Sequence, residues 1–549
     1  MILHGRVARV LAVAAAGGVI AAAAVVYQGR ADPVPSFRAQ ACALPERWLD
    51  RIQKGYFARH SGDISILPRT PAYFASSANG GWGHSGPWDY LQRVPLVFYG
   101  PGVVGGPAQA DRAATLADVA PTLAALLKGS LRTEDGEVLE EVARIDAARL
   151  GRPPPRVIVV VVWDGGGWNT LDQWPDAWPN LKRIMDEGVS YTEATVGSSP
   201  SVTPSVHTTL GTGVLPYVHG ITGIPLRSED GTVVDAFVNG ESSRFIQVPA
   251  LAERWDELHG NSAEIGMVGY EPWHLGMIGQ GAERPGGDRD DAVWLDTKTN
   301  EWITNPKHYR LPPALATTTG LQDDIRALDA ADGEVDGAWG EKAILDDVTR
   351  REETPAFIVY HTRAMINMMR ADGYGKDAVT DLVFTNYKQI DRLGHYFNMA
   401  SNEVRQSVEE TDRQLGVLLD FLDREVGRER WAVVVTADHG QQPDEKAVGG
   451  YGIDPGEVVR DIDRRFGEIT DRVPGTEVFL KPDALERTGV TVDEVARFLG
   501  DYRLQDNAWK PGDLIGGSGA LDASDRLFEL AIPSDMLDEI DCGSPSPSG

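Results

Sequence analysis

Carboxylate and imidazole side chains follow three separate apolar stretches of the chain, each within a few residues of its end. These side chains belong to Asp164, Asp391, His395, Asp438 and His439. Groups of this kind, gathered in one place, are the ligands that zinc or manganese takes in proteins. Asp391 and His395 are four residues apart, so on a helical turn they share a face and can hold the same ion. Each group of ligands after one apolar stretch is weak evidence alone, but the groups after all three stretches together predict a divalent-metal site.

A hydroxyl group is the second chemical feature of the sequence. Thr203 and Ser205 lie in a segment of small residues that leads into a helix-like run, TPSVHTTLGTG. The N-terminus of a helix offers backbone N–H donors and a dipole that favours an anion. A metal-bound hydroxyl at that place is deprotonated and nucleophilic. From this stretch alone, Thr203 is either that nucleophile or merely the cap of the helix.

The apolar stretches predict the framework that positions these groups. Seven apolar residues, mostly valine, fill 157–163 and end at Asp164, which three glycines follow. Such a run is typical of a buried central strand of a parallel sheet, and open α/β sheets bind ligands beyond the carboxyl ends of their strands. Strand patterns at 356–361, 381–386 and 431–437 alternate with helix patterns. We therefore expect an α/β fold: a doubly wound, mostly parallel sheet flanked by helices, with a small cap or insertion.

Length and charge bound the class of protein further. The chain has 549 residues and a formal net charge of −29. An excess of negative charge argues against binding a nucleic-acid polymer and against docking on anionic lipid through a basic patch. The length is ample for one large α/β domain with insertions, or for two domains.

Four motifs, in this order and spacing, resemble the alkaline phosphatase superfamily, and within it the type I phosphodiesterase/nucleotide pyrophosphatase group. They are WDGGGWNTL from Trp163, TPSVHTTLGTGVLPYVHGI from Thr203, YKQIDRLGHYF from Tyr387 and VVTADHG from Val434. The resemblance implies two divalent metal ions, zinc or manganese. It places Asp391 and His395 at the first metal site. The second metal site falls on Asp164, Thr203, Asp438 and His439.

The first site needs one more histidine, which in the resembled family comes near the C-terminus. No histidine follows His439, but residues 59–126 resemble the family's last stretch and contain His84. We expect His84 to complete the first site. We also infer a circular permutation, in which the family's C-terminal portion precedes its N-terminal strand. Folded termini are often close together, so such a rearrangement is tolerated.

The sequence differs from that of the resembled family at the positions that bind the phosphate group. Phosphate monoesterases of the family carry a Lys-x-Arg pair after a central strand, which clamps the non-bridging oxygens. Glu271 and Trp273 stand there in this chain, and Ile224 stands near the place where many members have asparagine. An acidic and an aromatic residue cannot neutralise a dianion. The departures favour a phosphodiester over a monoester, with Arg227 or Lys307 left as a candidate substitute for the clamp.

The resemblance thus implies an exported phosphoric ester hydrolase, first of all a phosphodiesterase, acting on a small-molecule, lipid or nucleotide phosphoester. Thr203 would attack phosphorus and form a phospho-threonine, which water then hydrolyses. Three alternatives stay open: a phosphate monoesterase with another clamp, a transferase that passes on the phosphoryl-linked group, and a non-catalytic surface protein that binds through this fold. Five further histidines are expected to be structural or peripheral: His207, His219, His274, His308 and His361. His60 precedes an expected strand and has no metal partner in the sequence.

The N-terminal segment and the cysteines bear on location. Residues 10–27 carry no charge and follow Arg6 and Arg9; their length is near the lower limit for spanning a bilayer. Positive residues ahead of such a segment favour an exported body. We expect either a single N-terminal anchor in the cell membrane, with membrane contact through this segment only, or a signal and a secreted body. Cys42 and Cys542 are the two cysteines of the chain, and in an exported protein we expect a disulfide between them rather than two free thiols.

Composition and pattern divide the chain into six expected segments. They are an anchor or signal at 1–30, the permuted part of the core at 42–128, a linker at 129–155, the main core at 156–445, a small α/β cap at 446–512 and a disordered tail at 543–549. The linker would join the ends that the permutation leaves free.

Overall fold

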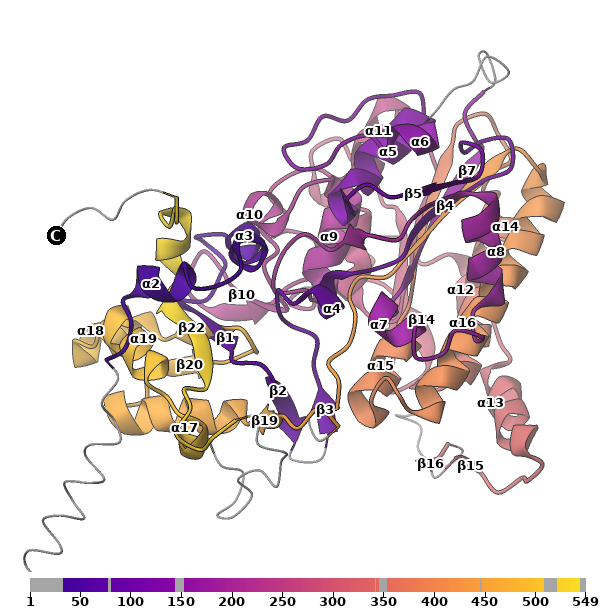
Figure 1. The fold of residues 1–549 in the computed structure, drawn as a ribbon. Coiled ribbons are helices and arrows are strands. Elements are labelled where there is room, and N and C mark those ends of the chain that lie inside the picture. The colour runs from indigo at the N-terminus through magenta and orange to yellow at the C-terminus, as the bar shows by residue number, and fades with distance from the viewer. Residues whose placement is uncertain are drawn as a thin grey trace, which may run out of the picture.

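The computed structural model describes residues 33–77, 80–143, 153–340, 342–344, 353–444, 447–507 and 521–543. These residues form a large α/β unit around a nine-stranded sheet and a smaller α/β unit around a four-stranded sheet (Figure 1). The expected anchor or signal at 1–30 lies outside the described residues, as do 144–152 of the linker and all but the first residue of the tail. Within the described part of the chain, no helix is both long enough and apolar enough to cross a membrane.

The large sheet is mixed, with a parallel centre. Its strands, in spatial order, are β14 (Glu301–Ile303), β13 (Asp291–Asp296), β12 (Ile265–Val268), β17 (Asp381–Tyr387), β7 (Val157–Trp163), β18 (Trp431–Thr436), β4 (Leu96–Tyr99), β8 (Val189–Tyr191) and β5 (Ala108–Ala110). The run from β13 to β18 is parallel, whereas β14, β4 and β8 join through antiparallel pairs. The expected α/β fold with a largely parallel sheet is confirmed.

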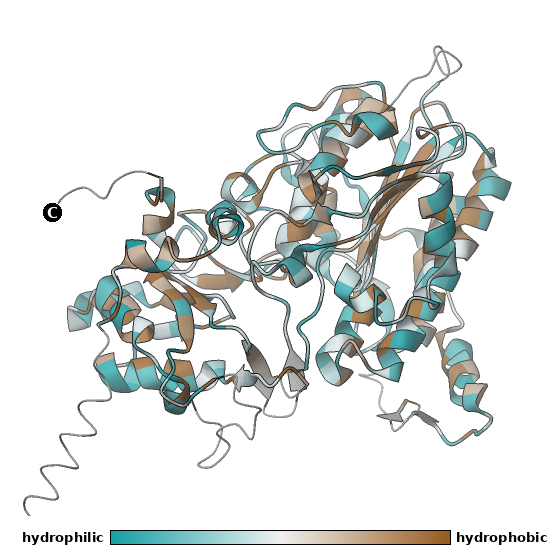
Figure 2. Ribbon diagram, in the orientation of Figure 1, coloured by the Kyte–Doolittle hydropathy of each residue, from teal (hydrophilic) through white to brown (hydrophobic). Residues whose placement is uncertain are grey.

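Strand β7 lies at the centre of this sheet and is buried on both faces, because every one of its residues is apolar. Ile158, Val160 and Val162 belong to the hydrophobic core on one face, and the residues between them belong to the core on the other. Figure 2 shows the hydrophobic strands between helices whose outer faces are hydrophilic. This two-sided burial explains why the sequence of β7 is continuously apolar rather than alternating.

Helices cover both faces of the large sheet. One core includes residues of α5 (Val119–Leu126), α9 (Thr203–Thr212), α11 (Leu251–Leu258) and the 3₁₀ turn η2 (Pro272–Met277). The other includes residues of α7 (Trp168–Leu171), α8 (Pro179–Glu187), α13 (Leu321–Asp329), α14 (Pro355–Asp372), α15 (Gln389–Phe397) and α16 (Asn402–Phe421). Short helices complete the unit: α4 (Asp89–Gln92), α6 (Glu140–Ala143), α10 (Pro216–His219) and α12 (Pro313–Ala316).

The smaller unit is built from three distant parts of the chain. Its sheet has the order β20 (Thr470–Arg472), β21 (Glu477–Leu480), β1 (Ile64–Pro68) and β22 (Phe528–Pro533), all antiparallel. Around it lie α2 (Phe37–Ala41), α3 (Glu46–Gly55), α17 (Pro455–Phe466), α18 (Pro482–Thr488) and α19 (Val492–Gly500). The expected cap at 446–512 therefore shares its sheet with strands from both ends of the chain. A disulfide joins Cys42 to Cys542 in this unit, as expected.

Four small sheets accompany the two main sheets in the described part of the chain. A three-stranded sheet, β19 (Tyr451–Ile453), β2 (Ala72–Ser77) and β3 (Gly80–Trp82), runs between the two units (Figure 1). The two-stranded ribbons pair β10 (Pro225–Arg227) with β11 (Val233–Asp235), β15 (Ala338–Trp339) with β16 (Lys342–Ala343), and β6 (Ala114–Thr115) with β9 (Ala194–Thr195).

Two segments differ from what their sequences suggest. Residues 356–361, expected as a strand, lie inside helix α14, which begins at Pro355. Proline at the first helical position fixes the starting geometry, and the apolar run that follows is buried because the helix packs into the core. The described part of the expected linker, 129–143, is folded onto the core: the carboxylate of Asp135 accepts hydrogen bonds from Leu215 N and from the Tyr217 hydroxyl, both at 2.9 Å.

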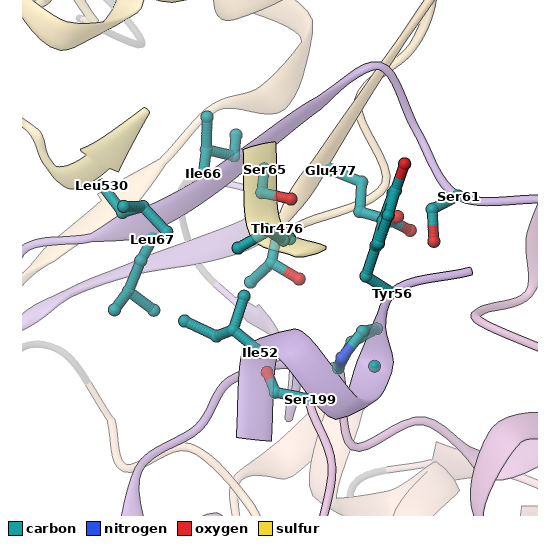
Figure 3. A pocket seen from close by; sticks show the side chains of 13 residues that line it. Ile52, Tyr56, Ser61, Ser65, Ile66, Leu67, Ser199, Thr476, Glu477 and Leu530 are labelled. Carbon is teal, nitrogen blue, oxygen red and sulfur yellow. The ribbon is translucent and has the colours of Figure 1, made fainter. Parts of the chain in front are cut away.

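A small cavity lies where α3 meets the sheet of the smaller unit (Figure 3). Its volume is about 20 Å³, which is room for a single water molecule. Glu477 of β21 and Tyr56 line it together with Ser199 from the large unit. The carboxylate of Glu477 accepts a hydrogen bond of 2.9 Å from Gly62 N.

Candidate metal and nucleophile site

The elements of the large sheet bring all the sequence-predicted site residues to one edge. Asp164 follows β7, and Asp438 and His439 follow the parallel neighbour β18. Asp391 and His395 lie on α15, which begins two residues after β17 ends. The remaining two are Thr203, the first residue of α9, and His84, in the loop between β3 and α4.

Tight backbone turns hold these residues close together. Gly165 adopts φ +70°, and a Cβ there would lie 3.0 Å from Cα of Asp391, so the residue after Asp164 has neither the conformation nor the space for a side chain. Its N–H donates to Oδ1 of Asp438 at 3.0 Å. The glycine run after β7 thus fixes one carboxylate against another.

Asp164, Asp438 and His439 form a first set of clustered ligand atoms, all within 4.8 Å of one another. His439 Nε2 lies 3.5 Å from Asp164 Oδ1 and 3.4 Å from Asp438 Oδ2. All three side chains are fully buried. Burial, reinforced by the charge of Asp438, raises the pKa of Asp164 well above its usual value, although the nearby Lys388 ammonium opposes the shift.

His84 and His395 gather around Asp391 in a second set. His84 Nε2 lies 3.6 Å and His395 Nε2 3.2 Å from Asp391 Oδ1. The ring of His84 stacks on that of His439 with centroids 3.5 Å apart, so the two sets are adjacent. His84 is oriented through Nδ1, 2.9 Å from the carbonyl oxygen of Ser201, which leaves Nε2 for the site.

The atoms of this site fit a pair of divalent metal ions. Asp438 Oδ2 and His439 Nε2 are buried and have no hydrogen-bond partner among the described residues, an arrangement that costs free energy unless a ligand satisfies it. Burial lowers the pKa of His439 to about 3 and that of His84 well below its usual value, so both imidazoles are neutral, the form that binds metal. The donor set of imidazole nitrogens and carboxylate oxygens is that of zinc or manganese.

Lys388 is a member of the site that the sequence reasoning missed. Its Nζ lies 3.0 Å from Asp164 Oδ1, 2.8 Å from Asp391 Oδ2 and 3.1 Å from Thr203 Oγ1. Although burial opposes it, the charges of Asp164 and Asp391 raise the pKa of Lys388, so its ammonium stays charged. The available signal was a lysine directly after the apolar strand β17 and three residues before Asp391.

A second layer of polar side chains lies behind the carboxylates. Asn386 Nδ2 donates to Asp164 Oδ2 at 2.9 Å, and His207 Nε2 lies 3.6 Å from Asp438 Oδ2. His274 Nδ1 in turn lies 3.0 Å from His207 Nδ1. His207, expected to be structural or peripheral, therefore contacts a predicted ligand directly. Its place one helical turn after Thr203 was the clue, because residues four apart share a helix face.

The positions that correspond to the family's phosphate clamp lie beside Lys388. The Trp273 ring centroid is 5.8 Å from Lys388 Nζ, and Glu271, at the start of η2, has a buried Oε2 without a hydrogen-bond partner among the described residues. The two expected substitutes are elsewhere: Arg227 forms an ion pair with Asp63 at 2.5 Å, and Lys307 is exposed in a loop.

Comparisons with known proteins agree with this fold. The pattern of the type I phosphodiesterase/nucleotide pyrophosphatase family matches residues 158–482. Alkaline phosphatase PafA of Elizabethkingia meningoseptica is 22% identical over 445 residues, covering 71% of this chain and 79% of the relative. A protein of Myroides odoratus described as a calcium-transporting ATPase is 23% identical over 405 residues, covering 62% of this chain and 72% of the relative. The crystal structure of wild-type PafA superposes with a TM-score of 0.54 at 19% identity, over 64% of this chain and 76% of that one.

Fold, site and comparisons together define the class of protein as a phosphoester hydrolase with an alkaline-phosphatase-like α/β fold. The chain belongs to the type I phosphodiesterase/nucleotide pyrophosphatase family.

Proposed function

We propose that this chain is an exported, metal-dependent phosphodiesterase that acts through a covalent phospho-threonine at Thr203. The observation that carries the proposal is the position of Thr203: its Oγ1 lies beside Lys388 Nζ, which also contacts one carboxylate from each of the two ligand sets. The disulfide between Cys42 and Cys542 supports export, because such bonds persist in oxidising compartments.

The proposed reaction is a two-step displacement in which Thr203 is the nucleophile. Thr203 Oγ1 loses its proton to solvent and attacks phosphorus, forming a new P–O bond while the bond to the leaving-group oxygen breaks. The leaving alkoxide takes up a proton, and water then cleaves the phospho-threonine and restores the hydroxyl. Two divalent ions, held by Asp164, Asp438 and His439 and by the Asp391 set, would supply Lewis-acid stabilisation of the attacking and leaving oxygens.

The surroundings of Thr203 favour a diester over a monoester. Lys388 is the one cationic side chain in contact with Thr203 Oγ1 among the described residues, whereas a monoester dianion is best held by several charged donors. Glu271 is buried near Lys388, and burial raises the pKa of Glu271; as a carboxyl group it cannot supply a second positive charge. One cation matches the single negative charge of a phosphodiester.

Phosphate monoester hydrolysis is the second candidate, because PafA is described as an alkaline phosphatase. Purified, metal-loaded full-length chain is to be assayed with an aryl phosphodiester and the matching aryl monoester at equal concentrations. We expect the larger kcat/KM for the diester. The larger value for the monoester would reverse the assignment, and activity on neither, with metal bound, would leave a binding protein as the better description.

Thr203→Ala is expected to abolish turnover, by about 1,000-fold or more, because the nucleophile is lost. Acid quenching of the wild-type enzyme during turnover, followed by mass spectrometry, is expected to place phosphate on Thr203. Thr299→Ala, which removes an exposed threonine hydroxyl, serves as the matched control and keeps full activity. Undiminished turnover by folded Thr203→Ala would refute the nucleophile assignment.

A further inference from the structure

A buried ammonium group lies between the two sets of predicted metal ligands. The Lys388 side chain is only 4% exposed. Its Nζ is within hydrogen-bond or ion-pair distance of Asp164, Asp391 and Thr203, at 2.8–3.1 Å. A lysine is almost never buried to this degree unless its charge is used or matched. Here it is matched by two carboxylates and also contacts a hydroxyl that has a chemical role.

Lys388 lies beside Glu271 and Trp273, which stand at the positions where the family's monoesterases carry the cationic pair that binds phosphate. The ring of Trp273 lies 5.8 Å from Nζ, and the charge of Lys388 lowers the pKa of Glu271 against the larger effect of burial. The ammonium therefore enters, from the residue between β17 and α15, the region in which η2 offers no cation. Arg227 and Lys307, which the sequence left as substitutes, do not reach it: one is paired with Asp63 and the other is exposed.

We propose that Lys388 is this enzyme's phosphate clamp: its ammonium binds a non-bridging oxygen of the phosphoryl group that Thr203 attacks, an inference that rests on the proposed function. When phosphorus is bonded to Oγ1, each non-bridging oxygen is separated from Oγ1 only by the phosphorus atom. An ammonium already 3.1 Å from Oγ1 is therefore within reach of one of them. The contact persists from attack to phospho-threonine, because Oγ1 stays bonded to the same phosphorus.

The balance of charges at the site explains why this clamp would favour a phosphodiester over a phosphate monoester. The three carboxylates of the site and an ionised Thr203 together carry as much negative charge as two divalent ions carry positive charge. Lys388 then adds a single positive charge. A phosphodiester monoanion neutralises it, whereas a monoester dianion leaves one negative charge unmatched in a buried site, which is costly.

The test compares wild type with Lys388→Met as metal-loaded full-length protein. Binding of inorganic phosphate is measured by isothermal titration calorimetry, metal content by mass spectrometry, and kcat and KM with an aryl phosphodiester. We expect unchanged metal content and phosphate binding weakened by about 10- to 100-fold, the range for losing one charge-assisted hydrogen bond. We expect a similar fall in kcat/KM. Lys307→Met, which removes an exposed lysine, is the matched control and is expected to change none of these.

The outcomes separate the possible roles of Lys388. Phosphate affinity equal to wild type in a folded, metal-loaded variant overturns the proposal, and so does loss of metal that accounts for the whole effect. If Lys388→Met does not fold, Lys388→Gln, which keeps a polar end and most of the length, takes its place under the same criteria. If the wild type hydrolyses no phosphoester, the proposed function fails on its own, while phosphate calorimetry still decides the role of Lys388.

Discussion

At the scale of a single residue, substitution of His84 tests whether its imidazole is a ligand at the first predicted metal site. It comes from a part of the chain far from the other ligands, yet its Nε2 faces Asp391 and its ring stacks on His439. We expect His84→Ala to lower bound metal from two ions to one per chain and to reduce turnover by about 100-fold or more, because a neutral buried ligand is removed. Metal analysis after dialysis measures the change.

The matched control for His84 is His308→Ala, since His308 lies outside the site and is only partly buried. Full metal content and activity in His84→Ala would remove the functional support for placing residues 42–128 with the core as a permuted segment. The permutation itself remains a prediction.

A second buried residue makes stability depend on pH. Burial raises the pKa of Glu477, at the cavity between the two units, to about 7 from an ordinary 4.5. The folded state therefore holds a proton that the unfolded state releases. The resulting stabilisation is complete below pH 4.5 and is lost as pH rises through 7, by about 3 kcal/mol in total.

Glu477→Gln is expected to remove this contribution, because glutamine stays neutral at every pH and still accepts the hydrogen bond from Gly62 N. Denaturant unfolding at pH 5 and pH 8 should then show a smaller fall in stability for the variant than for the wild type. Equal falls in both proteins would contradict the assignment of a protonated Glu477.

At the scale of elements, helix α9 positions Thr203, the proposed nucleophile. Its packing against η2 is close enough that a Cβ on Gly211 would lie 2.5 Å from Gly276 O and 2.6 Å from Met277 O. These are backbone atoms, which cannot move aside as a flexible side chain can. We expect Gly211→Ala to lower the free energy of unfolding by about 1–3 kcal/mol, despite the higher helix propensity of alanine.

Because α9 begins at Thr203, the same change is expected to reduce kcat more than it weakens substrate binding. Gly106→Ala is the control, since a Cβ there meets nothing within 4 Å. An unchanged melting temperature in Gly211→Ala would show that α9 and η2 can separate at little cost.

The parts of the fold that local pattern determines could be predicted, and the parts that distant pairing determines could not. The strand β7 and the acidic residue at its tip follow from one uninterrupted apolar run, and α15 follows from the spacing of Asp391 and His395. The apolar run at 356–361 fits a strand or a helix equally well, and tertiary packing made it α14. Lys388 directly follows the apolar strand β17, but the local sequence does not show that its side chain turns inward to reach Asp164 on another strand.

The disulfide acts at the scale of the whole molecule, because it joins residues 500 positions apart. Other contacts already hold these ends: Gln53 donates to the carbonyl oxygens of Leu537 and Ile540, and Gln40 accepts from Ala531 N. We expect the double variant Cys42→Ser/Cys542→Ser to fold and to keep its activity. Its free energy of unfolding is expected to fall by about 2–5 kcal/mol, since a long closed loop restricts the unfolded chain.

Chemical denaturation with and without reductant measures that loss. The wild type under reducing conditions should match the double variant, and the variant should not respond to reductant. A variant as stable as the oxidised wild type would show that the contacts of α2 and β22 hold the ends without the bond.

The assembly of the smaller sheet also sets the order in which the molecule can mature. Strand β1 at 64–68 has its partners at 477–480 and 528–533, so it stays unpaired until nearly the whole chain has emerged. Long-range pairing of this kind is slow. His84, Asp164 and His439 are likewise collected from distant segments, so a nascent chain has no finished pocket to capture an ion. The proposed metal site can therefore form only after the segment that carries His439 has been synthesised.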